Sequence, residues 1–240
     1  MSEIPKSIPI KNYDQFYERF SNWEIVGKSV SNRPIYKKVY QESAAKTLMV
    51  LSAVHGDETE GASCLAGFIY DLEESQIQLP DNVRLVVIPI ANPDGFFGFT
   101  RGNGNGVDLN RNLPTKDWTA EAREPKYNPG SSPGSEPENK VLLEQIEKES
   151  PELIVSLHSW KPLYNVNGDA HKVAQAMHAA LALEITEDIG YPTPGSLGTY
   201  CGLERNLPTI TWELQRGLKE SEAWPWGRKA MLACLEAFSG

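Results

Sequence analysis

The sequence predicts an α/β fold, a single domain with a mixed, mostly parallel sheet flanked by helices on both faces. Four short apolar runs rich in Val, Ile and Thr have the length and the continuous apolar character of strands buried on both faces. Helical patterns lie between these runs, and this alternation is typical of layered α/β domains. A chain of 240 residues can bury one such core and shows no linker, so we expect one catalytic domain over residues 1–240.

The expected elements follow one another along the chain. The strands are expected over residues 47–54, 84–92, 153–159 and 208–214. The helices are expected over residues 65–72, 135–150, 173–181 and 228–238. Ser135 and Glu138 have the spacing of a capping box at the start of the second helix. Two stretches rich in Gly and Pro, 92–133 and 190–204, are too long for plain connections, so we expect them to be functional loops.

The composition excludes several classes of partner. The chain has 23 basic and 32 acidic side chains, which gives a net charge of −9. Nucleic acids and anionic membrane surfaces both need a basic face, so neither is expected to bind. The sequence opens without a signal-peptide pattern and has no apolar run of membrane-spanning length. The three cysteines form no CxxC pair and indicate neither a disulfide framework nor a thiolate zinc site. We therefore expect a cytoplasmic protein.

Side chains that can bind a metal or transfer a proton stand at the ends of three expected strands. His55 and Glu58 follow the first strand, His158 ends the third, and Glu213 ends the fourth. Ligands of open α/β sheets bind at the carboxyl ends of the strands, so we expect these four residues to meet. Two histidines and a carboxylate form a known catalytic zinc set that leaves one position open for water. For Glu213 a salt-bridge partner or a cap is the structural alternative, and its place at a strand end favours the functional role.

The segment 101–112 adds cationic and amide groups to these candidates. Its glycines do not form a phosphate loop, because no Gly-Lys-Ser/Thr follows them. Arg111 has the chemistry of a bidentate clamp for a carboxylate, and Asn110 that of an amide donor. Asp108 has the chemistry of an acceptor that orients a metal ligand from behind. An anionic substrate must be bound by such local cations, because the overall charge repels it.

Together these residues resemble the M14 zinc carboxypeptidase family over about residues 30–215. The motifs that carry the resemblance, in the order of the family, are His55-x-x-Glu58, Arg101, Asn110-Arg111, His158 and Glu213. The resemblance implies that His55, Glu58 and His158 hold one Zn²⁺ per chain. The expected enzyme is therefore a zinc metallocarboxypeptidase or a related amidase, acting as a peptide hydrolase.

The same resemblance implies a role for each of the other matching residues. Glu213 is expected to be the general base, and Arg101 is expected to polarise the scissile carbonyl. Asn110 and Arg111 are expected to bind a terminal carboxylate. Asp108 is expected to orient the first histidine.

The short chain and the loop 190–200 are most similar to compact bacterial cytosolic members of this family. Those members cut the γ-D-glutamyl–meso-diaminopimelate bond of murein tripeptide, L-Ala-γ-D-Glu-meso-diaminopimelate, in cell-wall peptide recycling. The resemblance implies a small anionic peptide as substrate. Tyr191, Ser196 and Leu197 are expected to meet the far end of that peptide, and Tyr191 is expected to cover it. The sequence leaves open whether the protein forms a homodimer.

Three other functions compete with this interpretation. A zinc-dependent N-acyl-amino-acid deacylase, of the aspartoacylase and succinylglutamate desuccinylase kind, shares the zinc ligands and the Asn-Arg pair. An ordinary carboxypeptidase for α-linked peptides is the second, and a metal-free binding protein with the same fold is the third. The remaining histidines, His171 and His178, share one face of an expected helix, and we interpret them as a solvated surface.

Overall fold

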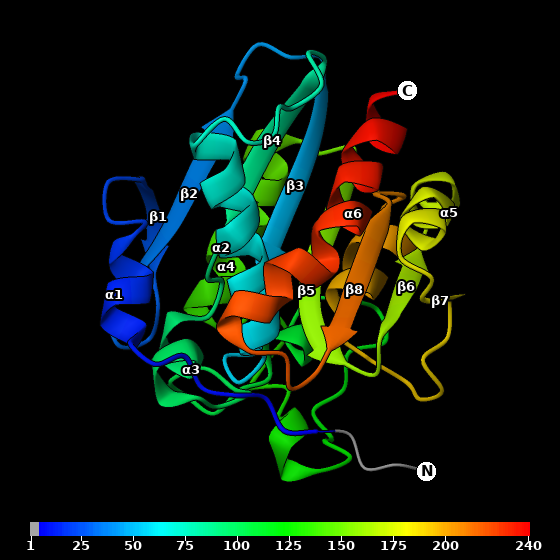
Figure 1. The fold of residues 1–240 in the computed structure, drawn as a ribbon. Coiled ribbons are helices and arrows are strands. Elements are labelled where there is room, and N and C mark those ends of the chain that lie inside the picture. Colours follow the sequence, from blue (N-terminus) through cyan, green and yellow to red (C-terminus); the bar gives the residue numbers. More distant parts are fainter. Residues whose placement is uncertain (1–4) are drawn as a thin grey trace.

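The computed structural model describes residues 5–240 and contains one eight-stranded sheet (Figure 1). The strands are β1 (Glu24–Lys28), β2 (Pro34–Tyr40), β3 (Lys46–Ser52), β4 (Val83–Ile88), β5 (Leu153–Trp160), β6 (Leu163–Asn167), β7 (Glu184–Thr186) and β8 (Thr209–Gln215). The α-helices are α1 (Tyr13–Glu18), α2 (Thr59–Glu73), α3 (Pro93–Gly98), α4 (Pro137–Glu149), α5 (His171–Ala180) and α6 (Glu220–Ser239). Three short helical turns are η1 (Leu109–Arg111), η2 (Pro125–Tyr127) and η3 (Gly198–Leu203). Within residues 5–240, no helix has the length and apolarity that a membrane crossing requires.

The sheet is mixed, with a parallel centre. Its strand order is β1-β2-β4-β3-β5-β8-β6-β7. The four central strands β4, β3, β5 and β8 run parallel, whereas β2 joins β4 and β6 joins β8 in antiparallel fashion. The predicted α/β class is thereby confirmed. Because the central strands are parallel, their carboxyl ends share one edge of the sheet, where ligands of such folds bind.

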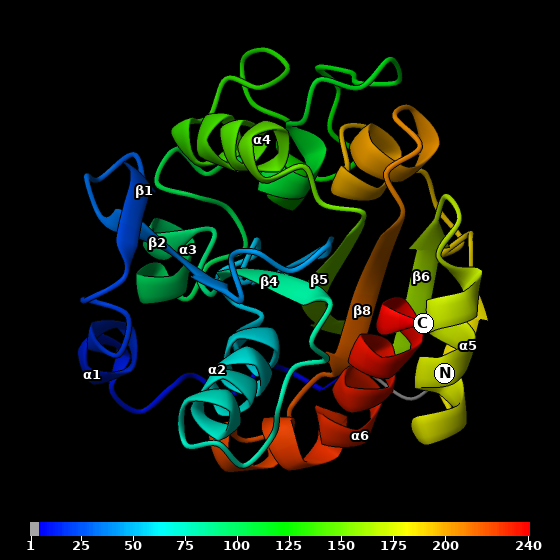
Figure 2. The same ribbon diagram turned by 90° about the horizontal axis from the view of Figure 1, so that it is seen from above.

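Helices cover both faces of the sheet (Figure 2). Helices α2, α5 and α6 lie on one face, and α4 lies on the other. Alternate residues of β3 divide between the two cores: Leu48 and Val50 pack with α2 and α6, whereas Met49 and Leu51 pack with α4. All four are fully buried. Burial on both faces explains why this strand has no polar residue in its centre.

The predicted elements correspond to the centre of the fold. The four expected strands are β3, β4, β5 and β8, and the four expected helices are α2, α4, α5 and α6. The two outer strands on each side of the sheet, β1, β2, β6 and β7, and the short helices α1 and α3 were not predicted. The two long loops also hold local structure, since 92–133 contains α3, η1 and η2, and 190–204 contains η3.

The capping box expected at the start of α4 is wrong. The helix begins at Pro137, and Glu136 at its N-cap makes no side-chain capping hydrogen bond. Ser135 donates its hydroxyl to Glu136 Oε1 instead. The carboxylate of Glu138 accepts hydrogen bonds from the Val30 amide and from Asn103. Tertiary partners therefore use the side chains that the local pattern assigns to the cap.

Candidate metal centre and substrate cavity

His55 and Glu58 lie on the short turn between β3 and α2. Ala53 turns the chain out of β3 with a left-handed backbone, φ 51°, which residues other than glycine rarely adopt. Gly56 lets the turn touch α3, because a Cβ there would lie 1.8 Å from the carbonyl carbon of Gly95. Glu58 takes the N-cap position of α2 without a capping hydrogen bond from its side chain. Its carboxylate is therefore available to the site.

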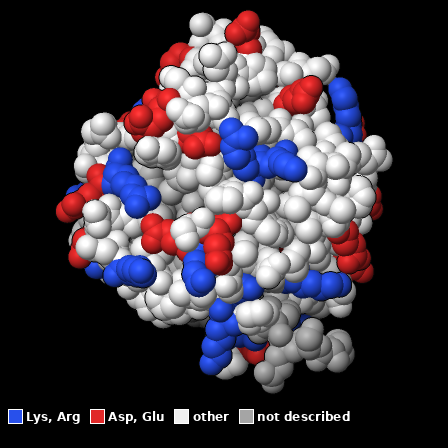
Figure 3. Space-filling view, in the orientation of Figure 1, with Lys and Arg blue, Asp and Glu red and all other residues white. Residues whose placement is uncertain are grey.

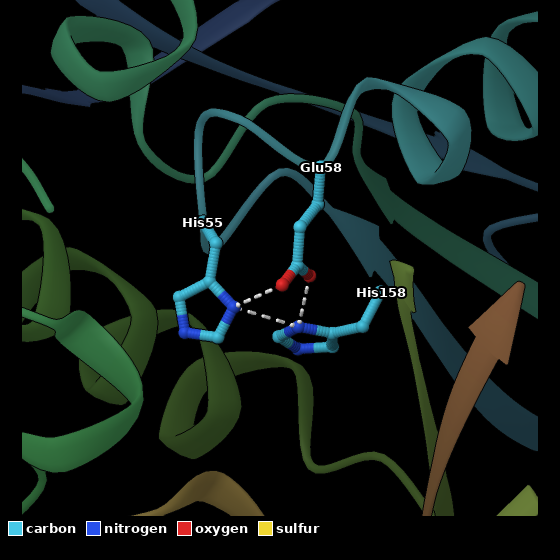
Figure 4. Close-up of side chains that lie close together, drawn as sticks. All are labelled: His55, Glu58 and His158. Carbon is cyan, nitrogen blue, oxygen red and sulfur yellow. Dashed lines mark hydrogen bonds and ion pairs between the residues drawn. The ribbon is translucent and has the colours of Figure 1, made fainter. Parts of the chain in front are cut away.

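Two imidazoles and one carboxylate converge at the carboxyl end of the sheet (Figure 4). His55 Nδ1 lies 3.0 Å from Glu58 Oε1, and His158 Nδ1 lies 2.8 Å from Glu58 Oε2. The two Nδ1 atoms are 3.1 Å apart. His158 comes from β5, so a strand, a turn and a helix start supply the three side chains. All three side chains are buried.

This arrangement fits a divalent metal ion. Ligand atoms at ~2.0–2.1 Å from a tetrahedral zinc are separated by about 3.3 Å, which is near the observed 3.1 Å between the two Nδ1 atoms. When both imidazoles carry their proton on Nε2, two Nδ1 lone pairs and a carboxylate face one another, and a cation satisfies all three. A His₂Glu set also leaves a fourth position open for water, as catalytic zinc sites require.

Asp108 orients the first histidine and two of its neighbours. Its Oδ1 lies 3.0 Å from His55 Nε2 and accepts the Asn110 amide at 2.9 Å. Its Oδ2 accepts Arg101 Nε at 2.8 Å. Burial alone would raise the pKa of Asp108, but the charges of Arg101 and His55 outweigh it and hold that pKa well below its usual range. The ionised carboxylate keeps Nδ1 of His55 directed at the cluster.

Glu213 stands beside the cluster on β8. It is the register partner of His158 on the neighbouring strand β5. Its Oε2 atom is buried and has no hydrogen-bond partner among residues 5–240. Burial, and after it the charge of Glu58, raises the pKa of Glu213 to about 8; a bound cation acts in the opposite direction. Such a carboxylate is suited to accept a proton from water at the metal centre.

The cations and the amide of segment 101–112 face the same cavity. Arg101 Nη1 lies 3.5 Å from Glu58 Oε1, whereas His158 contacts the other carboxylate oxygen, Oε2. Although burial lowers the pKa of Arg101, the carboxylates of Asp108 and Glu58 raise it overall, so the guanidinium stays charged. Asn110 Oδ1 accepts the Leu197 amide at 2.8 Å, which leaves its NH₂ group for a ligand. Arg111 is 6% exposed and lines the cavity.

The loop 190–200 contributes to the cavity in part. Tyr191 and Ser196 line it, and the Tyr191 ring packs edge-on against Trp160 with centroids 6.0 Å apart. Leu197 differs from the expectation that it meets the substrate. Its side chain is 3% exposed and packs in the core on the α4 face, and only its backbone amide acts in the site, through Asn110.

These side chains line one cavity of about 580 Å³. It also contains residues that sequence reasoning missed: Lys6, Tyr127, Trp160, Asn165 and Arg216. Lys6 lies near the terminus, Tyr127 in a loop without periodicity and Asn165 on an unpredicted strand, so their signals were weak. Trp160 and Arg216 stand at or just after the carboxyl ends of predicted strands, and that position was the signal that could have found them.

Tyr127 is the missed residue with the most contacts to the predicted ones. Its ring centroid lies 5.0 Å from Arg101 Cζ and 5.4 Å from Arg111 Cζ. Arg123 Cζ lies at 5.1 Å from the same ring. The electron-rich face of an aromatic ring attracts such cations, so the Tyr127 ring stabilises guanidinium groups that would otherwise repel each other.

The remaining histidines stay outside the site. His171 pairs with Glu187 at 3.1 Å, and His178 Nδ1 lies 2.6 Å from the Leu183 carbonyl oxygen. Both are on α5, away from the residues that line the cavity.

Comparison with known proteins assigns the class. The family model for zinc carboxypeptidases matches residues 10–189. The chain therefore belongs to the zinc carboxypeptidase family, M14, and is a metallopeptidase of that fold.

Within the family, the chain is similar to particular amidases. It is 36% identical to murein peptide amidase A of Vibrio campbellii over 200 residues, which cover 78% of this chain and 77% of that protein. The protein of the same name from Escherichia coli is 32% identical, with 79% and 80% covered. The crystal structure of an Escherichia coli murein-tripeptide amidase superposes with a TM-score of 0.71 at 28% identity, covering 90% of this chain and 91% of that one. Carboxypeptidase A from Helicoverpa armigera gives a TM-score of 0.77 at 20% identity, covering 95% and 71%, and shares the fold.

Proposed function

We propose that this protein is a zinc-dependent amidase that hydrolyses the γ-D-glutamyl–meso-diaminopimelate bond of murein tripeptide. One observation carries the catalytic part of the proposal: His55, Glu58 and His158 converge beside the unpaired carboxylate of Glu213 in a cavity that also holds two arginines. The similarity to murein peptide amidase A of two bacteria supports the substrate. One catalytic domain over residues 1–240 is part of the proposal, supported by the single sheet.

We propose one zinc ion per chain, held by His55 Nδ1, Glu58 and His158 Nδ1. When bound, zinc supplies a Lewis acid and lowers the pKa of water from 15.7 toward ~7. Asp108 keeps His55 in the tautomer whose Nδ1 carries no proton, because the ionised carboxylate accepts a hydrogen bond from Nε2–H. The buried surroundings keep these groups in fixed positions before substrate arrives.

Glu213 moves the proton in this scheme. Its unpaired Oε2 atom takes a proton from the attacking water and later delivers it to the leaving amine of diaminopimelate. Arg101 lies beside Glu58 and donates to the oxygen of the scissile carbonyl as negative charge develops there.

The terminal carboxylate of the leaving residue is assigned to Asn110 and Arg111. The side-chain oxygen Oδ1 of Asn110 accepts a hydrogen bond from the Leu197 amide, so the side-chain NH₂ group of Asn110 is free to donate. Arg111 offers a planar guanidinium on the wall of the same cavity. Tyr191 and Ser196 lie on that wall and are assigned to the far end of diaminopimelate. A substrate from recycled cell wall implies action in the cytoplasm.

Two competing enzymes use the same centre. A deacylase of the aspartoacylase kind and a carboxypeptidase for α-linked peptides would both need the zinc ligands and Arg111. The similarity to two murein peptide amidases over about four fifths of the chain favours the γ-linked tripeptide. A metal-free binding protein is disfavoured, because the full ligand set and Glu213 are in place.

A substrate panel tests the proposal. Purified zinc-loaded protein is given L-Ala-γ-D-Glu-meso-diaminopimelate, the α-linked L-Ala-D-Glu-meso-diaminopimelate, and N-acetylaspartate, and released amine is measured. We expect kcat/KM for the γ-linked tripeptide to exceed the other two by at least about 100-fold. Preferred cleavage of either alternative substrate would overturn the proposed function.

A further inference from the structure

The segment before α1 forms part of the cavity wall. Pro5, Lys6 and Ser7 line the cavity. Ser7 Oγ donates to Glu60 Oε2 at 2.8 Å, and Thr59 Oγ1 donates to the Ile8 carbonyl at 2.9 Å. Both partners lie in the first turn of α2, directly after the metal ligand Glu58. These hydrogen bonds hold residues 7 and 8 against the start of α2, and Lys6 lies next to them on the cavity wall.

Arg216, which follows β8, also binds the segment before α1. It follows the end of β8 and stands three residues after Glu213. Its Nε donates to Ser7 Oγ at 2.8 Å, and its Nη2 donates to Asp57 Oδ2 at 2.9 Å. Within residues 5–240, Nη1 makes no hydrogen bond, and the side chain is 18% exposed on the cavity wall. The guanidinium is thus fixed in place with donors left for a ligand.

Two chains of hydrogen bonds lead from the metal centre to cationic residues of the cavity. The first chain runs from His55 to Asp108 and from Asp108 to the backbone amide of Asn110, the residue before Arg111. The second chain begins at the Glu58 carboxylate, which accepts a hydrogen bond from the Ser159 amide at 3.2 Å.

From Ser159 the contacts continue toward the start of the chain. Its hydroxyl donates to Glu60 Oε2 at 2.7 Å, and that oxygen also binds Ser7. Lys6 and Arg216 stand at this second end. Lys6 and Arg216 therefore line the same cavity as Asn110 and Arg111 but belong to a different hydrogen-bond chain.

We propose that Lys6 and Arg216 form an anion subsite that binds the free α-carboxylate of the γ-linked D-glutamyl residue. This inference rests on the proposed function, in which Asn110 and Arg111 bind the carboxylate of the leaving residue. A γ-linkage leaves the α-carboxylate of D-glutamate free on the acyl side of the scissile bond. The two carboxylates of the substrate then match the two cationic ends of the cavity.

The charges around the cavity make this subsite selective. The protein has a net charge of −9, so an anionic peptide gains nothing from the overall field. Figure 3 shows several Lys and Arg side chains on the lower part of the face in view. A carboxamide in place of the α-carboxylate would leave charged donors without a charged acceptor, and sites built around such bonds discriminate strongly.

Two tripeptides that differ in one group test the inference. The first is L-Ala-γ-D-Glu-meso-diaminopimelate, and the second carries γ-D-isoglutamine, whose α-carboxylate is an amide. We expect the wild-type kcat/KM to favour the acid by about 10- to 100-fold, mostly through KM. Lys6→Met should reduce this acid-to-amide ratio to a few-fold, and Lys6→Arg should restore it. Arg216→Gln should reduce the ratio in the same way.

A matched control and the contrary results separate this subsite from a structural role. Lys28→Met removes a similar exposed lysine on β1, outside the cavity, and should keep the wild-type ratio. A loss of structure lowers kcat/KM on both peptides together and leaves the ratio unchanged. An unchanged ratio in both Lys6→Met and Arg216→Gln would overturn the inference, as would equal cleavage of acid and amide by the wild type. In those cases the γ-linked peptides are still cleaved, whereas failure of the proposed function leaves both intact.

Discussion

Asp108 is the residue that connects the separate tasks of the site. Its carboxylate binds the metal ligand His55, the guanidinium of Arg101 and the backbone amide of Asn110. In the proposed mechanism, His55 binds the metal, Arg101 binds the carbonyl oxygen of the scissile bond, and Asn110 binds the terminal carboxylate. One buried anion therefore fixes the relative positions of all three.

Glu213 permits a direct test at the scale of one side chain. Glu213→Gln keeps the size and shape of the side chain but removes its capacity to accept a proton. Because Glu213 is not among the three metal ligands, we expect zinc content to stay near the wild-type value while kcat falls by about 10²–10⁴-fold. Elemental analysis and tripeptide turnover are measured on the same preparation.

Glu147→Gln provides the control, since Glu147 is exposed on α4 and away from the cavity. Wild-type turnover by Glu213→Gln would remove this residue from the mechanism.

The sequence was most informative for residues fixed by the sheet. His158 and Glu213 lie on adjacent parallel strands, and a polar titratable group in a buried apolar strand is a strong signal. Tyr127 and Lys6 gave no such signal, because a loop and a chain terminus have no periodicity that fixes where a side chain lies. Leu197 shows the converse: its neighbours in the loop face the cavity, but tertiary packing buries it.

At the scale of elements, three of the four predicted strands are the most deeply buried ones. Strands β3, β4 and β5 are covered on both faces and read as continuous apolar runs. Strand β2 contains Lys37 and Lys38 in its centre, a composition that argues against a buried strand. The side chain of Lys37 is nevertheless 1% exposed, because tertiary partners that no local pattern reveals neutralise it.

Those partners join three elements in one buried network. Glu149 at the end of α4 binds Lys37 on β2 and Arg84 on β4. Gln145 accepts a further hydrogen bond from Lys37 Nζ at 3.0 Å. Burial would raise the pKa of Glu149, but hydrogen bonds from Lys37 and Arg84 outweigh it and lower that pKa. The ionised form is therefore the one that stabilises the fold.

This network predicts a pH-dependent loss of stability. A carboxylate with a depressed pKa in the folded state contributes its full stability above its unfolded value of ~4.3, and loses it as the pH falls through the folded value. Glu149→Gln should lower the free energy of unfolding by about 3 kcal/mol at pH 6, because Lys37 stays buried with less compensation. The deficit should shrink below pH 4. Urea unfolding of both proteins across pH 3–6 measures it, and a deficit that is independent of pH would contradict the assignment.

At the scale of the whole molecule, the fold brings distant parts of the chain to one cavity. The turn after β3, strands β5 and β8, the loop 92–133 and the segment before α1 all supply lining residues. The turn after β3 meets the ends of β5 and β8 because these strands run parallel, so that their carboxyl ends share one edge of the sheet. The position of the segment before α1 on the cavity wall depends on tertiary hydrogen bonds of Ser7 to Glu60 and Arg216, which the sequence alone does not reveal.

Zinc dependence tests the central claim most directly. The protein is stripped with a chelator, dialysed and titrated with Zn²⁺ while hydrolysis of L-Ala-γ-D-Glu-meso-diaminopimelate is followed. The account predicts that the stripped protein is inactive and that activity rises linearly and stops at one equivalent per chain, because His55, Glu58 and His158 form one site. Full tripeptide hydrolysis by the metal-free protein, or zinc binding at one equivalent without any hydrolysis of this peptide, would contradict it.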